Sequence, residues 1–85
     1  MKTVYGLYWK HVELGEEIMV STTWLDEREQ ADIIFDQLTI EKAQGIVMFS
    51  FEVEDDADDD DINALMDDFV AGQIYLADLG ATVLQ

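Results

Sequence analysis

The chain of 85 residues contains no cysteine and no proline. Without cysteine it has no disulfide framework, no thiolate nucleophile and no cysteine-based zinc or iron–sulfur site. Long apolar runs are also missing, because the longest uncharged apolar stretch covers only residues 46–51, too short to span a bilayer. The first residues show no apolar leader followed by a small-residue cleavage site. We therefore expect a soluble protein of the cytoplasm.

Basic residues are scarce: four Lys and Arg stand against twenty Asp and Glu, which gives a net charge of −16. Nucleic acids and anionic membranes repel such a chain, whereas basic protein surfaces attract it. We expect neither direct nucleic-acid binding nor membrane binding.

The residues needed for catalysis are also few. His11 is the single histidine, and neither Ser21 nor Ser50 stands in a glycine-flanked nucleophile turn. No glycine-rich phosphate-binding motif occurs. Carboxylates are so numerous that no pair of them points to acid–base chemistry. The sequence predicts a protein that is not an enzyme and uses no cofactor.

Apolar residues make up 49% of the chain, enough for one folded domain over residues 1–85. Alternating and β-branched patterns predict strands over residues 3–13, 17–23 and 46–54, with a turn at Leu14-Gly15-Glu16. A helix is expected from a capping box at Asp26 to a last turn at Lys42, with Gly45 as its stop.

A second helix follows the loop 55–61, with an apolar stripe that starts at Ile62. Residues 74–79 continue this helix or form a strand, continuation being preferred, and residues 81–85 add a short edge strand. The order β-β-α-β-α predicts a small α+β domain. An antiparallel sheet of three to four strands, hairpin first, carries both helices on one face.

The acids are unevenly distributed, since ten of the twenty fall between Glu52 and Asp68. Asp56, Asp58 and Asp60 have the spacing of the first calcium ligands in an EF-hand loop, and Asp67 falls at position 12. Asp61, however, occupies the position that requires glycine for the sharp turn. We expect weak, non-specific attraction of divalent ions and no specific metal site.

The size of the charge calls for a reason other than solubility. A net charge of magnitude about 2–8 is sufficient for a small soluble domain, and more destabilises the compact state by self-repulsion. Acids three or four residues apart on a helix have Cβ atoms about 5–6 Å apart, and alternate strand residues lie about 6.6 Å apart. These spacings are near those of backbone phosphates. The candidate partner-binding acids are Glu52, Glu54, Asp55, Asp56, Asp58, Asp59, Asp60, Asp61, Asp67 and Asp68, with Glu29, Asp32 and Asp36 on the first helix.

In these acids and in its small size the chain resembles the acidic nucleic-acid mimics made by phages and mobile elements. They include anti-CRISPR proteins, anti-restriction proteins and uracil-DNA glycosylase inhibitors. The resemblance implies an inhibitor that occupies the basic groove of a nucleic-acid-handling protein, such as a CRISPR effector, a restriction enzyme or a DNA-repair enzyme. It would act in the host cytoplasm if the gene is carried by a phage. Anti-CRISPR activity is our first choice.

Other interpretations stay open. An immunity protein against a nuclease toxin would carry a similarly acidic surface, and so would an acidic interaction module with no link to nucleic acid. A divalent-ion binder is a third alternative. Apolar side chains on both faces of the first strand also leave room for a homodimer.

Overall fold

An antiparallel sheet with strand order β2-β1-β3-β4 forms the middle of the protein in the computed structural model, which describes residues 1–12 and 18–85. The elements follow in the order β1 (Lys2–Val12), β2 (Ile18–Leu25), α1 (Arg28–Ile40), β3 (Gln44–Val53), α2 (Asp59–Val70) and β4 (Thr82–Val83). This confirms the α+β class, the order β-β-α-β-α and the short edge strand near the C-terminus. The expected turn at residues 14–16 lies outside the described residues.

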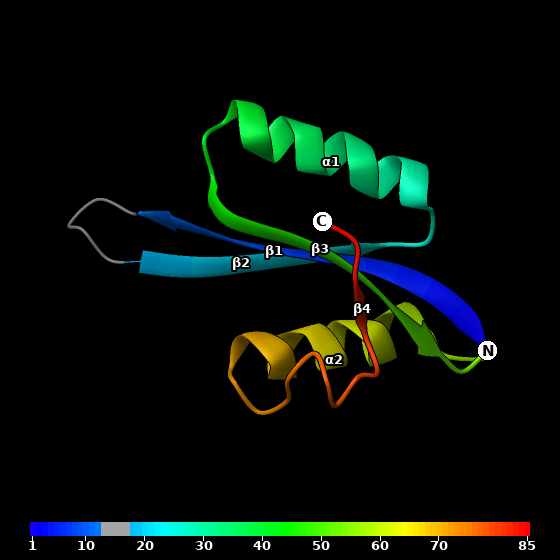
Figure 1. The fold of residues 1–85 in the computed structure, drawn as a ribbon. Helices are drawn as coiled ribbons and strands as arrows, with labels where there is room; N and C mark the ends of the chain where they lie inside the picture. The colour runs from blue at the N-terminus through cyan, green and yellow to red at the C-terminus, as the bar shows by residue number, and fades with distance from the viewer. Residues whose placement is uncertain (13–17) are drawn as a thin grey trace.

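The two helices lie on opposite faces of the sheet, with α1 on one side and α2 on the other (Figure 1). The expectation that both helices share one face is therefore wrong. The reason lies in β1 and β3, which carry apolar side chains on both of their faces. Helices on one side only would leave the buried Leu7 and Met48 in water.

Each face of the sheet has its own apolar core. On the α2 side, Val4 and Phe49 pack with Ile62 and Met66 of the helix. On the α1 side, Leu7 and Met48 pack with Ala31 and Leu38. No described polar or charged residue is buried, so the structure places every described carboxylate at least partly in solvent.

The ends of α1 differ from the expected ones. Its N-cap is Glu27 rather than Asp26, and the Glu27 side chain makes no capping hydrogen bond. After the helix, Lys42 adopts a left-handed conformation with φ 63°, while its N–H donates to Thr39 O and the N–H of Ala43 donates to Leu38 O. This is a Schellman ending. Lys42 therefore takes the stop position expected for Gly45, which lies in β3.

The second helix ends at Val70, so its continuation to residue 79 is wrong. Gly72 has φ 78°, and the N–H of Gln73 donates to Asp68 O in a second Schellman ending. Residues 74–79 form hydrogen-bonded turns, neither helix nor strand. Leu76 and Leu79 pack against the α2-side core and bring the chain back to β4, which pairs with Phe49 and Ser50.

Candidate acidic interaction surface

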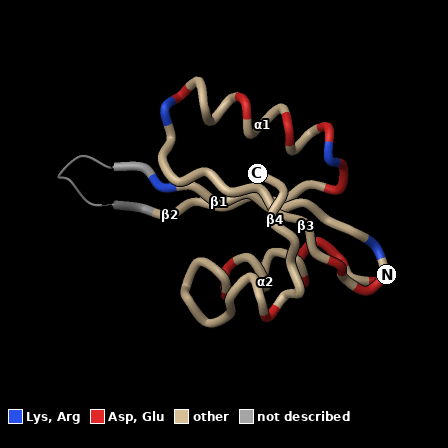
Figure 2. The backbone as a smooth tube through the Cα atoms, viewed as in Figure 1, with Lys and Arg blue, Asp and Glu red and all other residues tan. Residues whose placement is uncertain are grey.

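Eight of the predicted acids gather where β3 ends and α2 begins, near the N-terminus of the chain (Figure 2). All eight are exposed. We call this group the acidic end: Glu52, Glu54, Asp55, Asp56, Asp58, Asp59, Asp60 and Asp61. It carries eight carboxylates over ten residues, which makes it the densest charge on the chain.

The N-terminus of the chain fixes the loop of the acidic end. The terminal amino group of Met1 lies 3.1 Å from Asp55 Oδ1. Lys2 Nζ donates a hydrogen bond of 3.0 Å to Ala57 O. The N–H of Ala57 in turn donates to Glu54 O at 3.0 Å. The sequence gives no signal for these contacts, since Lys2 and Ala57 are 55 positions apart.

A capping box holds the first turn of α2. Asp58 is the N-cap, and its Oδ1 accepts a 2.9 Å hydrogen bond from the N–H of Asp61. Asp61 Oδ2 accepts from the N–H of Asp58 at 3.4 Å. Carboxylates in the first turn also interact favourably with the N-terminal end of the helix dipole. These contacts stabilise the run 58–61 despite the repulsion between its carboxylates. Asp59 and Asp60 are exposed, and their side chains take no part in the capping box.

A cavity of about 360 Å³ opens within the acidic end. Its apolar lining includes Val53, Ile62 and Leu65, and its charged lining includes Glu52 and Asp61. This combination suits a side chain with an aliphatic stem and a cationic head, as in Lys and Arg.

The remaining predicted acids lie away from this group. Glu29, Asp32 and Asp36 belong to α1, on the opposite face of the sheet from α2 (Figure 1). Asp32 is 4.0 Å from Arg28 Nε and accepts a 3.4 Å hydrogen bond from Gln85 Nε2. The thirteen predicted acids thus do not form one continuous array.

Asp67 and Asp68 stand in the second half of α2. Asp67 lines a groove beside Thr22 and Thr23 of β2. In the same groove, Trp24 Nε1 donates a 2.7 Å hydrogen bond to Asn63 Oδ1 and ties β2 to α2. The sequence has no local signal for this contact, since the two residues are 39 positions apart.

Among the described residues, no three His, Asp or Glu side chains are placed to hold a metal ion together. Of the acids with EF-hand-like spacing, Asp60 lies in the first turn of α2 and not in a loop. Neither described helix is long and apolar enough to cross a membrane.

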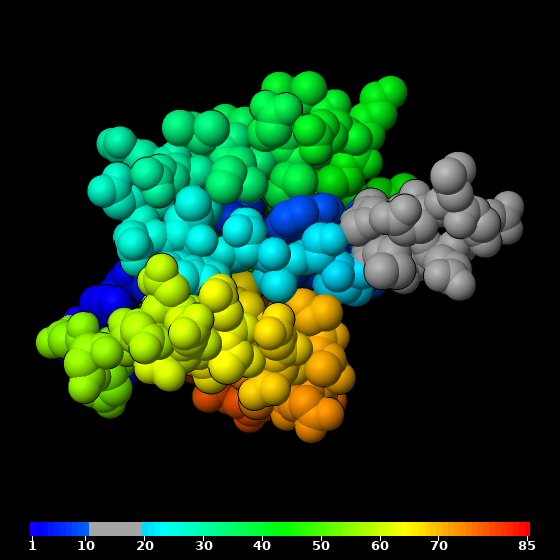
Figure 3. Space-filling model, turned by 180° about the vertical axis from the view of Figure 1, so that it is seen from behind, coloured from blue at the N-terminus to red at the C-terminus, as the bar shows by residue number. Residues whose placement is uncertain are grey.

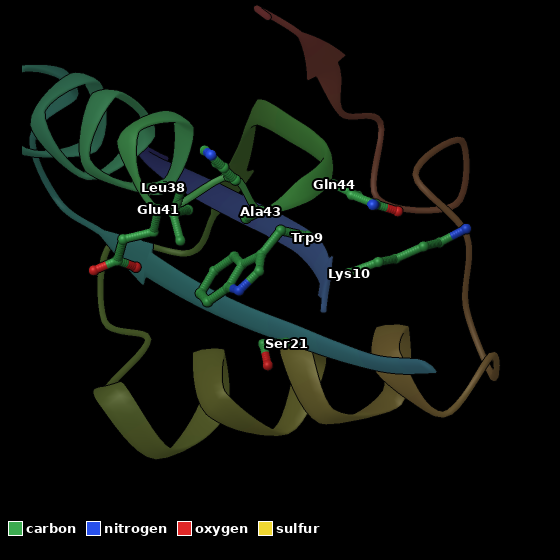
Figure 4. Close-up of a pocket in the computed structure, with 8 residues that line it drawn as sticks. Trp9, Lys10, Ser21, Leu38, Glu41, Ala43 and Gln44 are labelled. Carbon is green, nitrogen blue, oxygen red and sulfur yellow. The ribbon is translucent and has the colours of Figure 1, made fainter. Parts of the chain in front are cut away.

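A second cavity of about 520 Å³ lies at the other end of the sheet, near the start of β3. It is lined by Trp9, Lys10, Ser21, Leu38, Glu41, Lys42, Ala43 and Gln44. Lys10 extends away from the Trp9 ring, and Glu41 points in another direction (Figure 4).

Comparisons of the chain with protein-family models, with curated proteins and with solved structures found no match.

Proposed function

We propose that this protein inhibits a nucleic-acid-handling protein by placing its acidic end in the basic groove that normally holds DNA or RNA. The observation that carries the proposal is the acidic end itself: eight exposed carboxylates on an ordered loop and a capped helix turn. A CRISPR effector is our first choice of target. Because such targets act in the cytoplasm, we infer that the protein acts there too.

Order in the acidic end supports this proposal over a purely solubilising role. A fixed array of carboxylates loses little conformational entropy when it meets a fixed array of Lys and Arg. The cavity beside Ile62 and Leu65 adds apolar contact for the stem of one cationic side chain.

The first experiment is capture of targets from a nuclease-treated host lysate with the tagged protein, followed by elution with salt. We expect a nucleic-acid enzyme or CRISPR complex that its own DNA or RNA competes off the protein. A basic protein that nucleic acid does not displace would support an acidic interaction module instead. A co-encoded nuclease toxin would support an immunity protein.

Two matched variants locate the working surface. The first replaces Asp56, Asp59 and Asp60 with Asn, and leaves the capping box intact. The second makes Glu29→Gln, Asp32→Asn and Asp36→Asn on α1. Each changes the net charge from −16 to −13.

We expect the first variant to lose inhibition and the second to keep most of it, while both keep the wild-type circular dichroism spectrum. Inhibition is measured as residual activity of the captured enzyme. Equal loss in both variants would show that net charge, not the acidic end, is responsible.

A further inference from the structure

A groove of about 360 Å³ lies where β2 meets α2, and it shares no described lining residue with the cavity of the acidic end. Figure 3 shows the two elements in contact at the surface, with β2 directly above α2. Of the described residues that line this groove, Asp67 is the single charged one and Trp24 the single aromatic one. The volume is within the range of about 300–1,000 Å³ that is typical of small-molecule sites.

The Trp24 ring is held in place from two sides. It packs against the apolar core on the α2 side of the sheet. Its Nε1 donates a 2.7 Å hydrogen bond to Asn63 Oδ1, which also holds the Asn63 side chain. Trp24 is nevertheless only partly buried, and it forms part of the groove wall. Because the ring is already ordered, a ligand that stacks on it costs little side-chain entropy.

The charge around the groove favours a cation. Asp67 is exposed, and no described cation pairs with its carboxylate. Asp59 and Asp60 stand one helical turn before Asn63, and Asp67 stands one turn after it, so these acids share a face of α2. No described Lys or Arg lines the groove. An anion would therefore be repelled here, whereas a cation is attracted by Asp67 and by the acids beside it.

We propose that the groove binds an arginine side chain of the partner, with the guanidinium group stacked on the Trp24 ring and paired with the Asp67 carboxylate. An aromatic face attracts a cation within about 6 Å of the ring centroid, and tryptophan does so best. Arginine suits this pair better than lysine, because its planar guanidinium stacks on rings and is more weakly hydrated than an ammonium group. The Thr22 hydroxyl donates a 2.9 Å hydrogen bond to Leu7 O and keeps its oxygen as an acceptor.

This inference rests on the proposed function for the identity of the partner, and it extends the surface that the partner contacts. Asp60 of the acidic end and Asp67 are separated by about 10.5 Å along the axis of α2. A partner that meets the acidic end therefore reaches the groove with a neighbouring basic residue. Trp24 adds an aromatic contact beside the carboxylates, and tryptophan and arginine are the residues that most often dominate binding energy.

The test uses the whole isotope-labelled protein and N-acetyl-arginine amide, a probe that carries a guanidinium group and no carboxylate. Nuclear magnetic resonance follows the indole N–H signals of both tryptophans at constant ionic strength. We expect the Trp24 signal to shift and saturate, while the Trp9 signal, from the cavity at the other end of the sheet, changes little. The neutral N-acetyl-citrulline amide should leave both signals unchanged. A Trp24 signal that does not shift, or that shifts no more than that of Trp9, overturns the proposal.

Matched variants identify the carboxylate involved. Asp67→Asn is paired with Asp68→Asn, because both acids are exposed on α2 and each substitution removes the same charge. Of the two, only Asp67 lines the groove. We expect Asp67→Asn to raise the dissociation constant of the arginine probe several-fold and Asp68→Asn to change it little. An equal effect of the two variants would show attraction by the net charge alone and would overturn the site.

The choice of arginine has its own test. N-acetyl-lysine amide should bind more weakly than the arginine probe and shift the Trp24 signal less. Equal affinity of the two probes overturns the assignment to arginine.

The probe needs no target, so this inference and the proposed function fail separately. In the inhibition assay, Asp67→Asn should weaken the protein several-fold, whereas Asp68→Asn should have little effect. A groove that binds arginine in a protein that inhibits no nucleic-acid-handling enzyme would remove the proposed function alone. An inhibitor that is unaffected by Asp67→Asn, or whose Trp24 signal does not respond to arginine, would remove the groove alone.

Discussion

Gly6 illustrates how tightly one residue fits its neighbour. It is buried on β1 and faces Phe49 of β3 in the sheet register. A Cβ at this position would stand 2.5 Å from Phe49 Cζ and 2.7 Å from Phe49 Cε2. The ring cannot move freely, since its centroid lies 5.7 Å from that of Phe69 and 6.2 Å from that of Tyr8. The absence of a side chain at Gly6 thus sets the position of the central aromatic ring.

We therefore expect Gly6→Ala to destabilise the fold by about 1–3 kcal/mol through overpacking. Urea unfolding followed by fluorescence measures this change. The same substitution in a Phe49→Leu background should cost less, because the smaller side chain leaves room for the methyl group. A Gly6→Ala protein as stable as the wild type would contradict the close approach.

At the scale of the element, the acids at the start of α2 both cap the helix and expose negative charge. Asp58 and Asp61 satisfy backbone N–H groups of the first turn, whereas Asp59 and Asp60 have no such role. Neutralising the whole run 58–61 would therefore mix a loss of capping with a loss of charge. Helix α1 has no comparable side-chain cap at Glu27.

We expect Asp58→Ala to lower stability by about 0.5–2 kcal/mol, and Asp58→Asn to be nearly neutral because Asn caps as well as Asp. Chemical denaturation of both variants separates the two effects. Asp59→Ala serves as the control and should have a small effect. Equal stability of the Asp58→Ala and Asp58→Asn proteins would show that the capping box contributes little.

At the scale of the whole molecule, the net charge of −16 opposes folding through self-repulsion. The described cations offset little of it. Arg28 is 4.0 Å from Asp32 and both side chains are about half exposed, which makes their ion pair weak. The amino group of Met1 and Lys2 are the cations at the acidic end. Salt should therefore stabilise the fold by screening this repulsion, and it should also weaken binding of the acidic end to a basic partner.

We expect the melting temperature to rise between about 0.1 M and about 1 M NaCl, since the Debye length shrinks to about 3 Å. A gain of about 1 kcal/mol in the free energy of unfolding would raise the melting temperature by about 4–8 °C in a domain of this size. The variant with Asp56, Asp59 and Asp60 replaced by Asn should show a smaller salt response. A melting temperature that does not change with salt would mean that self-repulsion is not significant.

The sequence predicted the order and type of the strands and helices, because the signals for these elements are local; the bounds of α1 and the segment 74–79 were not predicted. Alternation along Val47, Phe49 and Phe51 identified a strand, and the spacing of Ile62, Leu65 and Met66 identified a helix. It also located ten acids between Glu52 and Asp68, and the structure gathers the eight of residues 52–61 at one end because neighbours in sequence stay neighbours in space. The left-handed Lys42 escaped prediction because that conformation favours glycine, and Gly45 stood three residues away.

The face of the sheet that each helix covers has no signal in the sequence and was seen only in the folded structure. A pattern of apolar residues shows that a face is buried, but not by which element. The sequence showed apolar residues on both faces of the first strand, and the structure places α1 over one of these faces, where Leu7 and Met48 form a second core with Ala31 and Leu38. Because the sheet lies between the two helices, Glu29, Asp32 and Asp36 of α1 are separated from the acids of α2 (Figure 1). Contacts across 55 positions, such as that of Lys2 with Ala57, depend on this arrangement and have no local signal.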